Sequence, residues 1–320
     1  MRRTIRSINR SSDFPEARHT SRRGREFRRP GRTISLELCA SMILAYQNLS
    51  DEQLRSAADI YEHVARGLEQ NGHPWLAQFG HIAAAEIDLL NDENKQCWGG
   101  PFNGQTGRTA IMEAILKTCL LENVVETGTF RGTTTEYLAQ RVIGRVYSCE
   151  NEPRYFLYSR RRLEPLGNVE IHLGDSRAFL QTLLSRESVC QARTLFYLDA
   201  HWSIDLPLAS EVEIILKNHP ASVIAIDDFE IPHDRGYGFD NYGPDKRLSL
   251  PILAAFRSAV PNFYVPSIGA AEETGAKRGC IWFASNEYLD QLLAQVPNLR
   301  RVDERDWALY DAQAERVEGS

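Results

Sequence analysis

The chain has 320 residues, of which 42% are apolar and 25% are charged. This composition is typical of a globular protein, and it excludes intrinsically disordered and fibrous chains. The length suits one large α/β domain with additions, or two small domains. No apolar run approaches the ~20 residues that cross a bilayer, so we expect no membrane partner.

The net charge of −6 is unevenly distributed along the chain. Residues 1–33 contain eleven arginines and three acidic residues, a balance of +8, so the remainder carries −14. A body this acidic repels nucleic acid, and we expect no nucleic-acid partner. The alternative is a nucleic-acid-binding protein that uses the basic tail, although Phe14 and Phe27 are the only aromatic residues there.

Residues 1–33 lack apolar periodicity, which predicts a disordered basic tail. A start codon assigned too early, a transit peptide and a twin-arginine signal at Ser21-Arg22-Arg23 are the alternatives. The apolar stretch from Ile34 to Tyr46 is interrupted by Glu37, and no Ala-x-Ala cleavage site follows it. The tail is therefore the favoured interpretation.

The six cysteines are scattered along the sequence, and they form no Cys-x-x-Cys pair and no cluster with histidine. They stand at positions 39, 97, 119, 149, 190 and 280. This spacing argues against a disulfide scaffold and against a structural zinc site. It favours the reducing environment of the cytoplasm.

Residues 34–108 are expected to form a helical cap and a lid loop. Apolar residues lead into Ser50-Asp51-Glu52, a helix start, and Gly72 ends that helix. A further helix is predicted from Trp75 to Leu90. Residues 97–108 contain four glycines and a proline, which is typical of a loop. A plain linker is one interpretation, but five of its side chains favour a lid over a ligand: Trp98, Phe102, Asn103, Gln105 and Arg108.

After Thr109 the sequence alternates between strands and helices, as far as residue 285. Strand-like apolar runs occupy 123–127, 145–149, 168–173, 194–199 and 222–227, and helical stretches occupy 133–142, 153–164, 176–184 and 207–218. This alternation predicts an α/β domain whose doubly wound, mostly parallel sheet is covered on both faces. Strands at 262–266 and 279–284 would close the sheet, and 286–320 is expected to be a helical tail.

The first predicted strand ends in a glycine turn. Gly128 permits a tight turn, and Gly132 would let the next helix lie close to the strand. A dinucleotide fingerprint requires glycine where this chain has Phe130, so the turn suits a nucleoside better than a pyrophosphate. Glu126, at the end of the strand, could receive a cation or a hydroxyl group.

The next two strands also end in acidic residues. Glu150 follows Glu126 by twenty-four residues, and an acid near this position commonly binds both hydroxyls of a ribose. Asp175 could meet the exocyclic amine of adenine, and Ser176 could assist it or cap the following helix. Three such features in order on one sheet edge indicate an adenosine site.

The fourth and fifth strands end in three more carboxylates. Asp199, Asp227 and Asp228 would all point into the crevice at the carboxyl ends of the strands. Close carboxylates repel one another unless a proton or cation intervenes, so they predict a site for Mg²⁺ or another divalent cation. Capping and backbone hydrogen bonds are the alternative. His201 is predicted to be the catalytic base. The alternative is a histidine that hydrogen-bonds to the site residues without touching the substrate.

The segment 229–247 is too long for an ordinary turn between a strand and a helix. It is rich in glycine and aromatic residues, among them Tyr237 and Tyr242. These features predict a substrate loop, and an oligomer contact is the alternative.

From about 97 to 285 the chain resembles the class I S-adenosylmethionine-dependent methyltransferases, and within them the metal-dependent O-methyltransferases of the catechol and macrolide- or aminocoumarin-sugar types. Glu126-x-Gly128-x-x-x-Gly132 is similar to their first motif, and Asp199, Asp227 and Asp228 match the metal-ligand positions. The resemblance implies a Rossmann-like, seven-stranded sheet with the last strand antiparallel. It implies S-adenosylmethionine as cofactor, bound by Glu126, Gly128, Thr129, Gly132, Thr133, Glu150, Asp175, Ser176 and Asp199.

The resemblance also implies a reaction, the methylation of a small-molecule hydroxyl on a sugar, a natural product or a catechol-like ring. In the sugar branch a second acid serves as base where this chain has His201, a departure from the family pattern. The runner-up is an iron-dependent oxygenase on the same fold, using Asp199, His201 and Asp227. An NAD dehydrogenase is disfavoured by Phe130. A homo-oligomer is compatible with the sequence.

Overall fold

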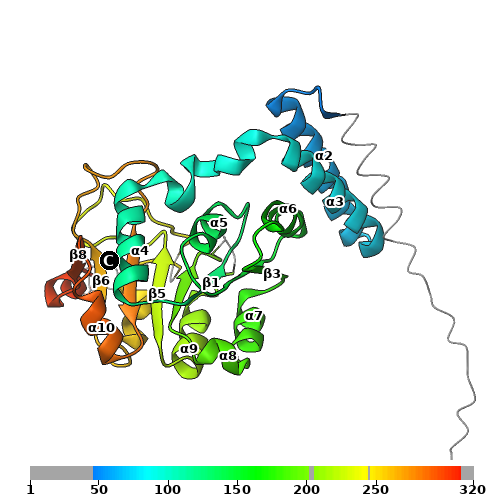
Figure 1. Cartoon of the computed structure of the whole chain (residues 1–320). Helices are drawn as coiled ribbons and strands as arrows, with labels where there is room; N and C mark the ends of the chain where they lie inside the picture. Colours follow the sequence, from blue (N-terminus) through cyan, green and yellow to red (C-terminus); the bar gives the residue numbers. More distant parts are fainter. Residues whose placement is uncertain (1–45, 202–204, 244–245, 311–320) are drawn as a thin grey trace, which may run out of the picture. The chain divides into compact units, whose positions relative to one another are not determined.

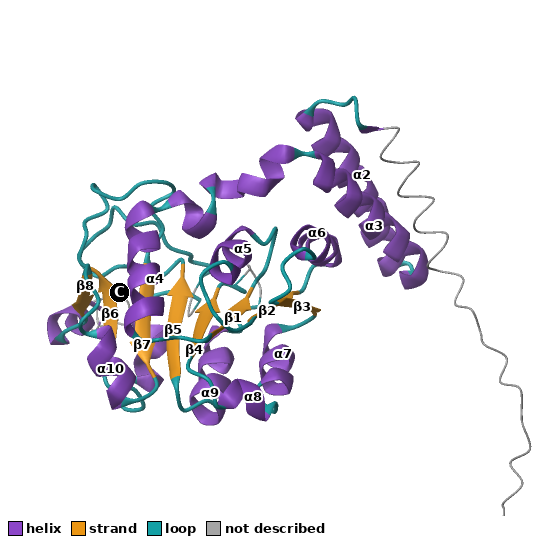
Figure 2. Ribbon diagram, viewed as in Figure 1, coloured by secondary structure: helices purple, strands orange, loops and turns teal. Residues whose placement is uncertain are grey.

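The computed structural model describes residues 46–201, 205–243 and 246–310 (Figures 1 and 2). The predicted basic tail, with its alternatives, and the apolar stretch that precedes Tyr46 lie outside the described residues, as does the end of the C-terminal tail from 311. Within the described ranges, no helix is both long enough and apolar enough to cross a membrane.

The core of the fold is one eight-stranded sheet in the order β3-β2-β1-β4-β5-β7-β6-β8. Strands β1 to β5 are parallel, and β7 runs antiparallel between β5 and β6. The strands are β1 (Asn123–Thr127), β2 (Val146–Glu150), β3 (Val169–Leu173), β4 (Thr194–Leu198), β5 (Ser222–Asp227), β6 (Phe263–Pro266), β7 (Cys280–Ala284) and β8 (Leu299–Arg301). The predicted doubly wound, mostly parallel sheet is therefore confirmed.

The sheet has one strand more than the expected seven. The additional strand is β8, which pairs antiparallel with β6 at the edge of the sheet. It lies in the C-terminal stretch for which only helix was expected. With three residues, β8 is too short to show the alternating pattern by which a strand is predicted from sequence.

Helices lie on both sides of the sheet (Figure 2). Because strand side chains alternate between faces, Leu195 and Tyr197 of β4 join one apolar core while Phe196 and Leu198 join the other. The helices are α2 (Asp51–Gln70), α3 (Pro74–Leu90), η1 (Asp92–Gly99), η2 (Pro101–Gly104), α4 (Thr106–Thr118), α5 (Thr133–Ala139), α6 (Pro153–Leu163), α7 (Ser176–Leu183), α8 (Glu187–Cys190), α9 (Leu208–Asn218), η3 (Leu250–Phe256) and α10 (Glu287–Leu293). Helices α4, α5 and α10 contribute to the first core, and α7, α9 and η3 to the second.

The two helices that the sequence predicts before the sheet are present as α2 and α3, and they form an antiparallel hairpin (Figure 2). Ser50 caps α2, since its side chain accepts from Gln53 N and the Gln53 side chain accepts in return from Ser50 N. Gly72, with a φ of 80°, turns the chain after α2. The hairpin is tied to α6 by Arg154, whose guanidinium grips the buried carboxylate of Asp88 at 2.7 and 3.0 Å.

Residues 92–105 connect the hairpin to α4 through the short turns η1 and η2. Trp98, Phe102 and Asn103 adopt left-handed backbone conformations, with φ between 52° and 60°, which non-glycine residues rarely do. The ring of Phe102 is buried against those of Tyr137 and Tyr197. The predicted irregular loop is thus confirmed up to residue 105, and residues 106–108 form the first turn of α4.

Candidate functional site

The turn after β1 can be built only with glycine at its first position. Gly128 has a φ of 87°, and a Cβ atom there would lie 2.5 Å from the carbonyl oxygen of Asp199. The β1 turn therefore lies directly against the end of β4. Gly132 also has a positive φ, but a Cβ atom there would meet Leu163 of α6 at 2.7 Å. The absence of a side chain at Gly132 thus allows α6 to pack closely against the turn. The prediction was that it would allow α5 to lie close to β1.

Glu126 lies at the base of this turn and is fully buried. Its Oε2 atom accepts hydrogen bonds from Thr135 Oγ1 at 2.5 Å and from Ser148 Oγ at 2.6 Å. Thr129, the next predicted cofactor residue, lies 2.6 Å from the same Ser148 hydroxyl. Burial raises the pKa of Glu126 to about 7.

Replacing Glu126 by glutamine should make the protein more stable than the wild type at pH 8 but not at pH 4. The pKa of Glu126 is about 7 in the folded chain against 4.5 unfolded, so the folded state binds the extra proton between these values. Wild-type stability therefore falls relative to the variant as pH rises through that window, by about 3 kcal/mol in total. The amide oxygen can still accept both hydroxyls. Urea unfolding from pH 4 to 8 measures the difference, and a difference independent of pH would contradict the assignment.

Glu150 ends β2 and holds the β1 turn from the other side. Its Oε2 atom accepts from Phe130 N at 2.7 Å, and its Oε1 atom accepts from Glu152 N at 2.9 Å. Burial raises the pKa of Glu150. The carboxylate is thus placed beside the turn, as an acid that binds a ribose must be, and its role toward the ribose stays a prediction.

Asp175 and Ser176 lie at the start of α7. The Asp175 carboxylate accepts from Arg177 N at 2.9 Å and from Ala178 N at 3.3 Å, so it caps the helix. The Arg177 side chain also pairs with it and lowers its pKa. Ser176 is buried. Helix capping, which was the alternative role for Ser176, is thus performed by Asp175, and the predicted contact of Asp175 with adenine has to compete with Arg177.

A pocket lies between the β1 turn and the connecting segment 97–103. From the described chain, its wall comprises Cys97, Trp98, Gly100, Phe102, Asn103, Glu126, Gly128, Thr129, Phe130, Arg131, Thr133, Thr134, Asp199 and Asp227. Three of the five predicted lid residues thus meet the glycine turn and the end of β4. The other two predicted lid residues, Gln105 and Arg108, are absent from the described wall of this pocket. Gln105 instead clasps the backbone of Arg278, accepting from its N at 2.6 Å and donating to its carbonyl at 3.0 Å.

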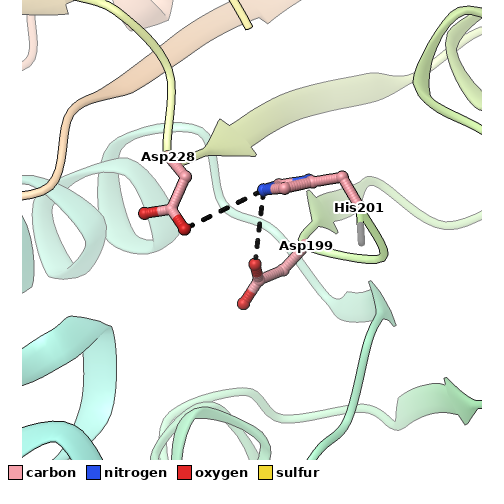
Figure 3. A group of neighbouring side chains, drawn as sticks. All are labelled: Asp199, His201 and Asp228. Atoms are coloured by element: carbon pink, nitrogen blue, oxygen red, sulfur yellow. Dashed lines mark ion pairs between the residues drawn. The ribbon is translucent and has the colours of Figure 1, made fainter. Parts of the chain in front are cut away.

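Beside this pocket, Asp199, His201 and Asp228 point toward one another (Figure 3). One ligand atom from each lies within 4.8 Å of the others. His201 Nε2 is 3.7 Å from Asp199 Oδ1 and 4.0 Å from Asp228 Oδ2. It is also 3.9 Å from Oδ2 of Asp240, a residue of the predicted substrate loop. Asp199 belongs to both the pocket and this cluster.

The cluster contains a buried histidine nitrogen without a hydrogen-bond partner among the described residues, and the pKa values of all three of its side chains are shifted. His201 is 3% exposed, and its Nε2 atom has no hydrogen-bond partner among the described residues. Burial lowers the pKa of His201, which favours the neutral imidazole. Burial, together with the charges of Asp227 and Asp228, raises the pKa of Asp199. For Asp228, burial and Asp227 raise the pKa to about 6.

Asp227 does not join the cluster, which corrects the predicted ligand set. Its Oδ1 atom accepts from the buried guanidinium of Arg108 and, at 2.7 Å, from Asp228 N. Its Oδ2 atom accepts from the Tyr197 hydroxyl at 2.5 Å. A guanidinium that is 2% exposed requires a carboxylate partner, and Asp227 supplies it. Arg108 is therefore a buried structural residue at the end of β5.

The loop 229–247 reaches the cluster through Tyr242 and Asp240. The Tyr242 hydroxyl donates to the carbonyl oxygen of His201 at 2.8 Å and also pairs with Asp240. The Tyr237 hydroxyl donates instead to the carbonyl of Ile268 at 3.0 Å, so this buried tyrosine anchors the loop. Tyr237 is thus removed from the predicted substrate contacts, whereas Tyr242 remains beside the site.

No family model matches the chain, and no curated protein matches it. An O-methyltransferase from Bacillus cereus in complex with SAH is similar over 56% of this chain and 81% of its own, with 21% identity and a TM-score of 0.43. The O-methyltransferase TomG from Streptomyces achromogenes, involved in tomaymycin synthesis and solved with SAM, covers 56% and 80%, with 20% identity and a TM-score of 0.42. Cofactor-bound Rv0187 from MTB covers 63% and 90%, with 17% identity and a TM-score of 0.44. At these values the chemistry of this chain has to be inferred from its own residues.

Sequence reasoning missed Arg278, which completes the acidic site. Its Nε atom donates to Asp228 Oδ1 at 2.6 Å, and its terminal nitrogen pairs with Asp240. Arg278 lies two residues before β7, in a stretch of sequence that contains no catalytic motif. Asp240 could have been found, because it lies in the loop that the sequence analysis identified as too long for a turn.

Proposed function

We propose that this protein is an S-adenosylmethionine-dependent methyltransferase that requires a divalent metal and acts on a hydroxyl group of a small molecule such as a sugar, a natural product or a catechol-like compound. One observation carries the proposal. Asp199 forms part of the wall of the glycine-turn pocket and also part of the Asp199–His201–Asp228 cluster. A nucleoside cofactor and a metal-bound hydroxyl would therefore meet at this residue.

The cluster has the properties of a metal site. It offers two carboxylates and one neutral imidazole, and the buried His201 Nε2 atom lacks a partner that a cation would supply. The described residues in and next to the cluster include four carboxylates and two guanidinium groups, which leave a surplus of two negative charges when all four acids are ionised: Asp199, Asp227, Asp228, Asp240, Arg108 and Arg278. A divalent ion balances this surplus.

The imidazole changes which metal we expect. Mg²⁺ prefers oxygen ligands, whereas Mn²⁺, Fe²⁺, Co²⁺ and Zn²⁺ also accept histidine nitrogen. When bound, such an ion lowers the pKa of a coordinated hydroxyl group. Because His201 Nε2 faces three carboxylates, we propose that His201 is a ligand of this ion, in place of its predicted role as base.

The pocket residues would position the cofactor and favour its charged form. The Gly128 turn would position the cofactor beside Asp199, and the segment that contains Trp98 would cover it. Glu126, Asp199 and Asp227 outnumber the one cationic side chain that the described wall of the pocket contains, and when ionised they favour a cationic sulfonium over the neutral thioether product. The main contribution to rate would then be the alignment of the two reactants.

Isothermal titration of the purified protein with S-adenosylmethionine and with S-adenosylhomocysteine tests the cofactor. We expect saturable binding of both with one site per chain. We also expect the sulfonium form to bind more tightly at low salt and at a pH above about 7, where the Glu126 carboxyl group of the pocket wall is ionised. The absence of binding at millimolar cofactor would overturn the proposed function.

A second candidate is a metal-dependent oxygenase, and one observation favours it. Two carboxylates and a histidine are the ligand set of many non-haem iron oxygenases. The structure assembles this set from Asp199, His201 and Asp228, whereas the sequence analysis named Asp227 as the third member. Oxygen uptake by the Fe²⁺-loaded protein, without any binding of S-adenosylmethionine, would support this function instead.

A further inference from the structure

The pocket wall contains one cationic side chain from the part of the chain that the structure describes, Arg131. It lies in the turn between β1 and α5, two residues after Thr129 and one before Gly132. The same wall contains three acidic residues, Glu126, Asp199 and Asp227. A pocket that presents both signs of charge is suited to a ligand that carries both signs.

The charge of Arg131 is incompletely paired. Its nearest carboxylate is Asp88 of α3, with Nη2 3.5 Å from Oδ1. Arg154 already holds both oxygens of Asp88, at 2.7 and 3.0 Å, and Asn94 donates to Oδ1 as well. The Nε atom of Arg131 is buried and has no hydrogen-bond partner among the described residues. Asp88 can therefore orient this guanidinium without neutralising it.

Aromatic rings hold the Arg131 guanidinium in place. Its central carbon lies 5.2 Å from the centre of the Phe130 ring, 5.7 Å from that of Tyr155 and 6.0 Å from that of Tyr158. The side chain is 15% exposed, so little water reaches it. A planar guanidinium in such surroundings is well suited to a carboxylate, which it can bind through two parallel hydrogen bonds.

We propose that Arg131 binds the carboxylate of the amino-acid end of the cofactor, with Asp88 as its positioning residue. The inference rests on the proposed function and extends it to a part of the ligand that the acidic residues cannot hold. The cofactor's amino-acid end carries a carboxylate, while its ammonium and sulfonium groups are cationic. Arg131 matches the first, and the acidic wall of the pocket matches the other two.

Comparing two ligands separates this role from a structural one. S-Adenosylhomocysteine contains the amino-acid end, whereas 5′-methylthioadenosine lacks it and keeps the adenosine. Calorimetry should show that Arg131→Met weakens S-adenosylhomocysteine about 10- to 100-fold, as expected for a lost charge-assisted pair, and leaves 5′-methylthioadenosine unchanged. Arg131→Lys, which keeps the charge but not the planar fork, should fall between the variant and the wild type. Arg141→Met is the matched control, because Arg141 pairs with Glu113 outside the pocket and should alter neither ligand.

Three results would contradict the inference in distinguishable ways. Equal losses for the two ligands in Arg131→Met would show that Arg131 supports the fold of the turn. An unchanged affinity for S-adenosylhomocysteine would show that another group binds the carboxylate. If the wild-type protein binds neither ligand, the proposed function itself fails, and the role of Arg131 fails with it.

Discussion

If His201 is the metal ligand that we propose, replacing it by alanine should reduce methyl transfer about a thousandfold, because the loss of a ligand removes several kcal/mol of transition-state stabilisation. Cofactor affinity should not change, since His201 is absent from the described wall of the pocket, unlike Asp199. The variant should also bind Mn²⁺ more weakly, which titration followed by electron paramagnetic resonance measures directly. The wild-type enzyme should lose its activity in excess chelator and recover it when Mn²⁺ or Fe²⁺ is restored.

The exposed His63 on α2 provides the control for this experiment, and His63→Ala should leave turnover and metal affinity unchanged. If His201 were the base and not a ligand, the alanine variant would lose activity but keep its affinity for Mn²⁺. Full activity of the wild type in excess chelator would contradict the metal site altogether.

The largest effect on stability should come from Arg108. Arg108→Met leaves the buried carboxylate of Asp227 without its guanidinium, and it also removes a donor to the carbonyl of Gly279 at 3.0 Å. Breaking one side of a buried pair costs about 3–5 kcal/mol. Chemical denaturation should therefore show a lower free energy of unfolding by about this amount.

The double variant Arg108→Met/Asp227→Asn should recover part of that loss, because no uncompensated charge remains buried. Arg141→Met removes a partly exposed pair with Glu113 and should cost less than about 1 kcal/mol. Equal losses in the single and double variants would show that the ion pair is not the origin of the effect.

The positions of the acidic residues at the strand ends were predictable, because the local sequence shows where each strand ends. Buried parallel strands are nearly continuous apolar runs, and the polar residue that ends each run marks the edge where ligands bind. This is why Glu126, Glu150, Asp199 and Asp228 were all predicted at that edge, and the structure places them there.

Which of those acids would be free for a ligand was not predictable from local sequence. Asp227 and Asp228 are adjacent in sequence, yet Arg108 of α4 pairs with Asp227. Asp175 likewise has a local competitor in Arg177, which a strand-end pattern does not reveal. Pairings of this kind depend on what the whole fold brings near each carboxylate.

The contacts made by the segment just before β7 determine when the site can form during synthesis of the chain. Arg278 is held by Gln105 through its backbone and by Asp228 through its side chain, and Arg108 grips the carbonyl of Gly279. A nascent polypeptide that has emerged from the ribosome only as far as Asp228 therefore lacks the counter-charges and backbone partners that these buried groups need. Such contacts between residues far apart in sequence form late. The Asp199–His201–Asp228 cluster, which we propose to bind a metal, should therefore form only after the chain has been translated beyond Gly279.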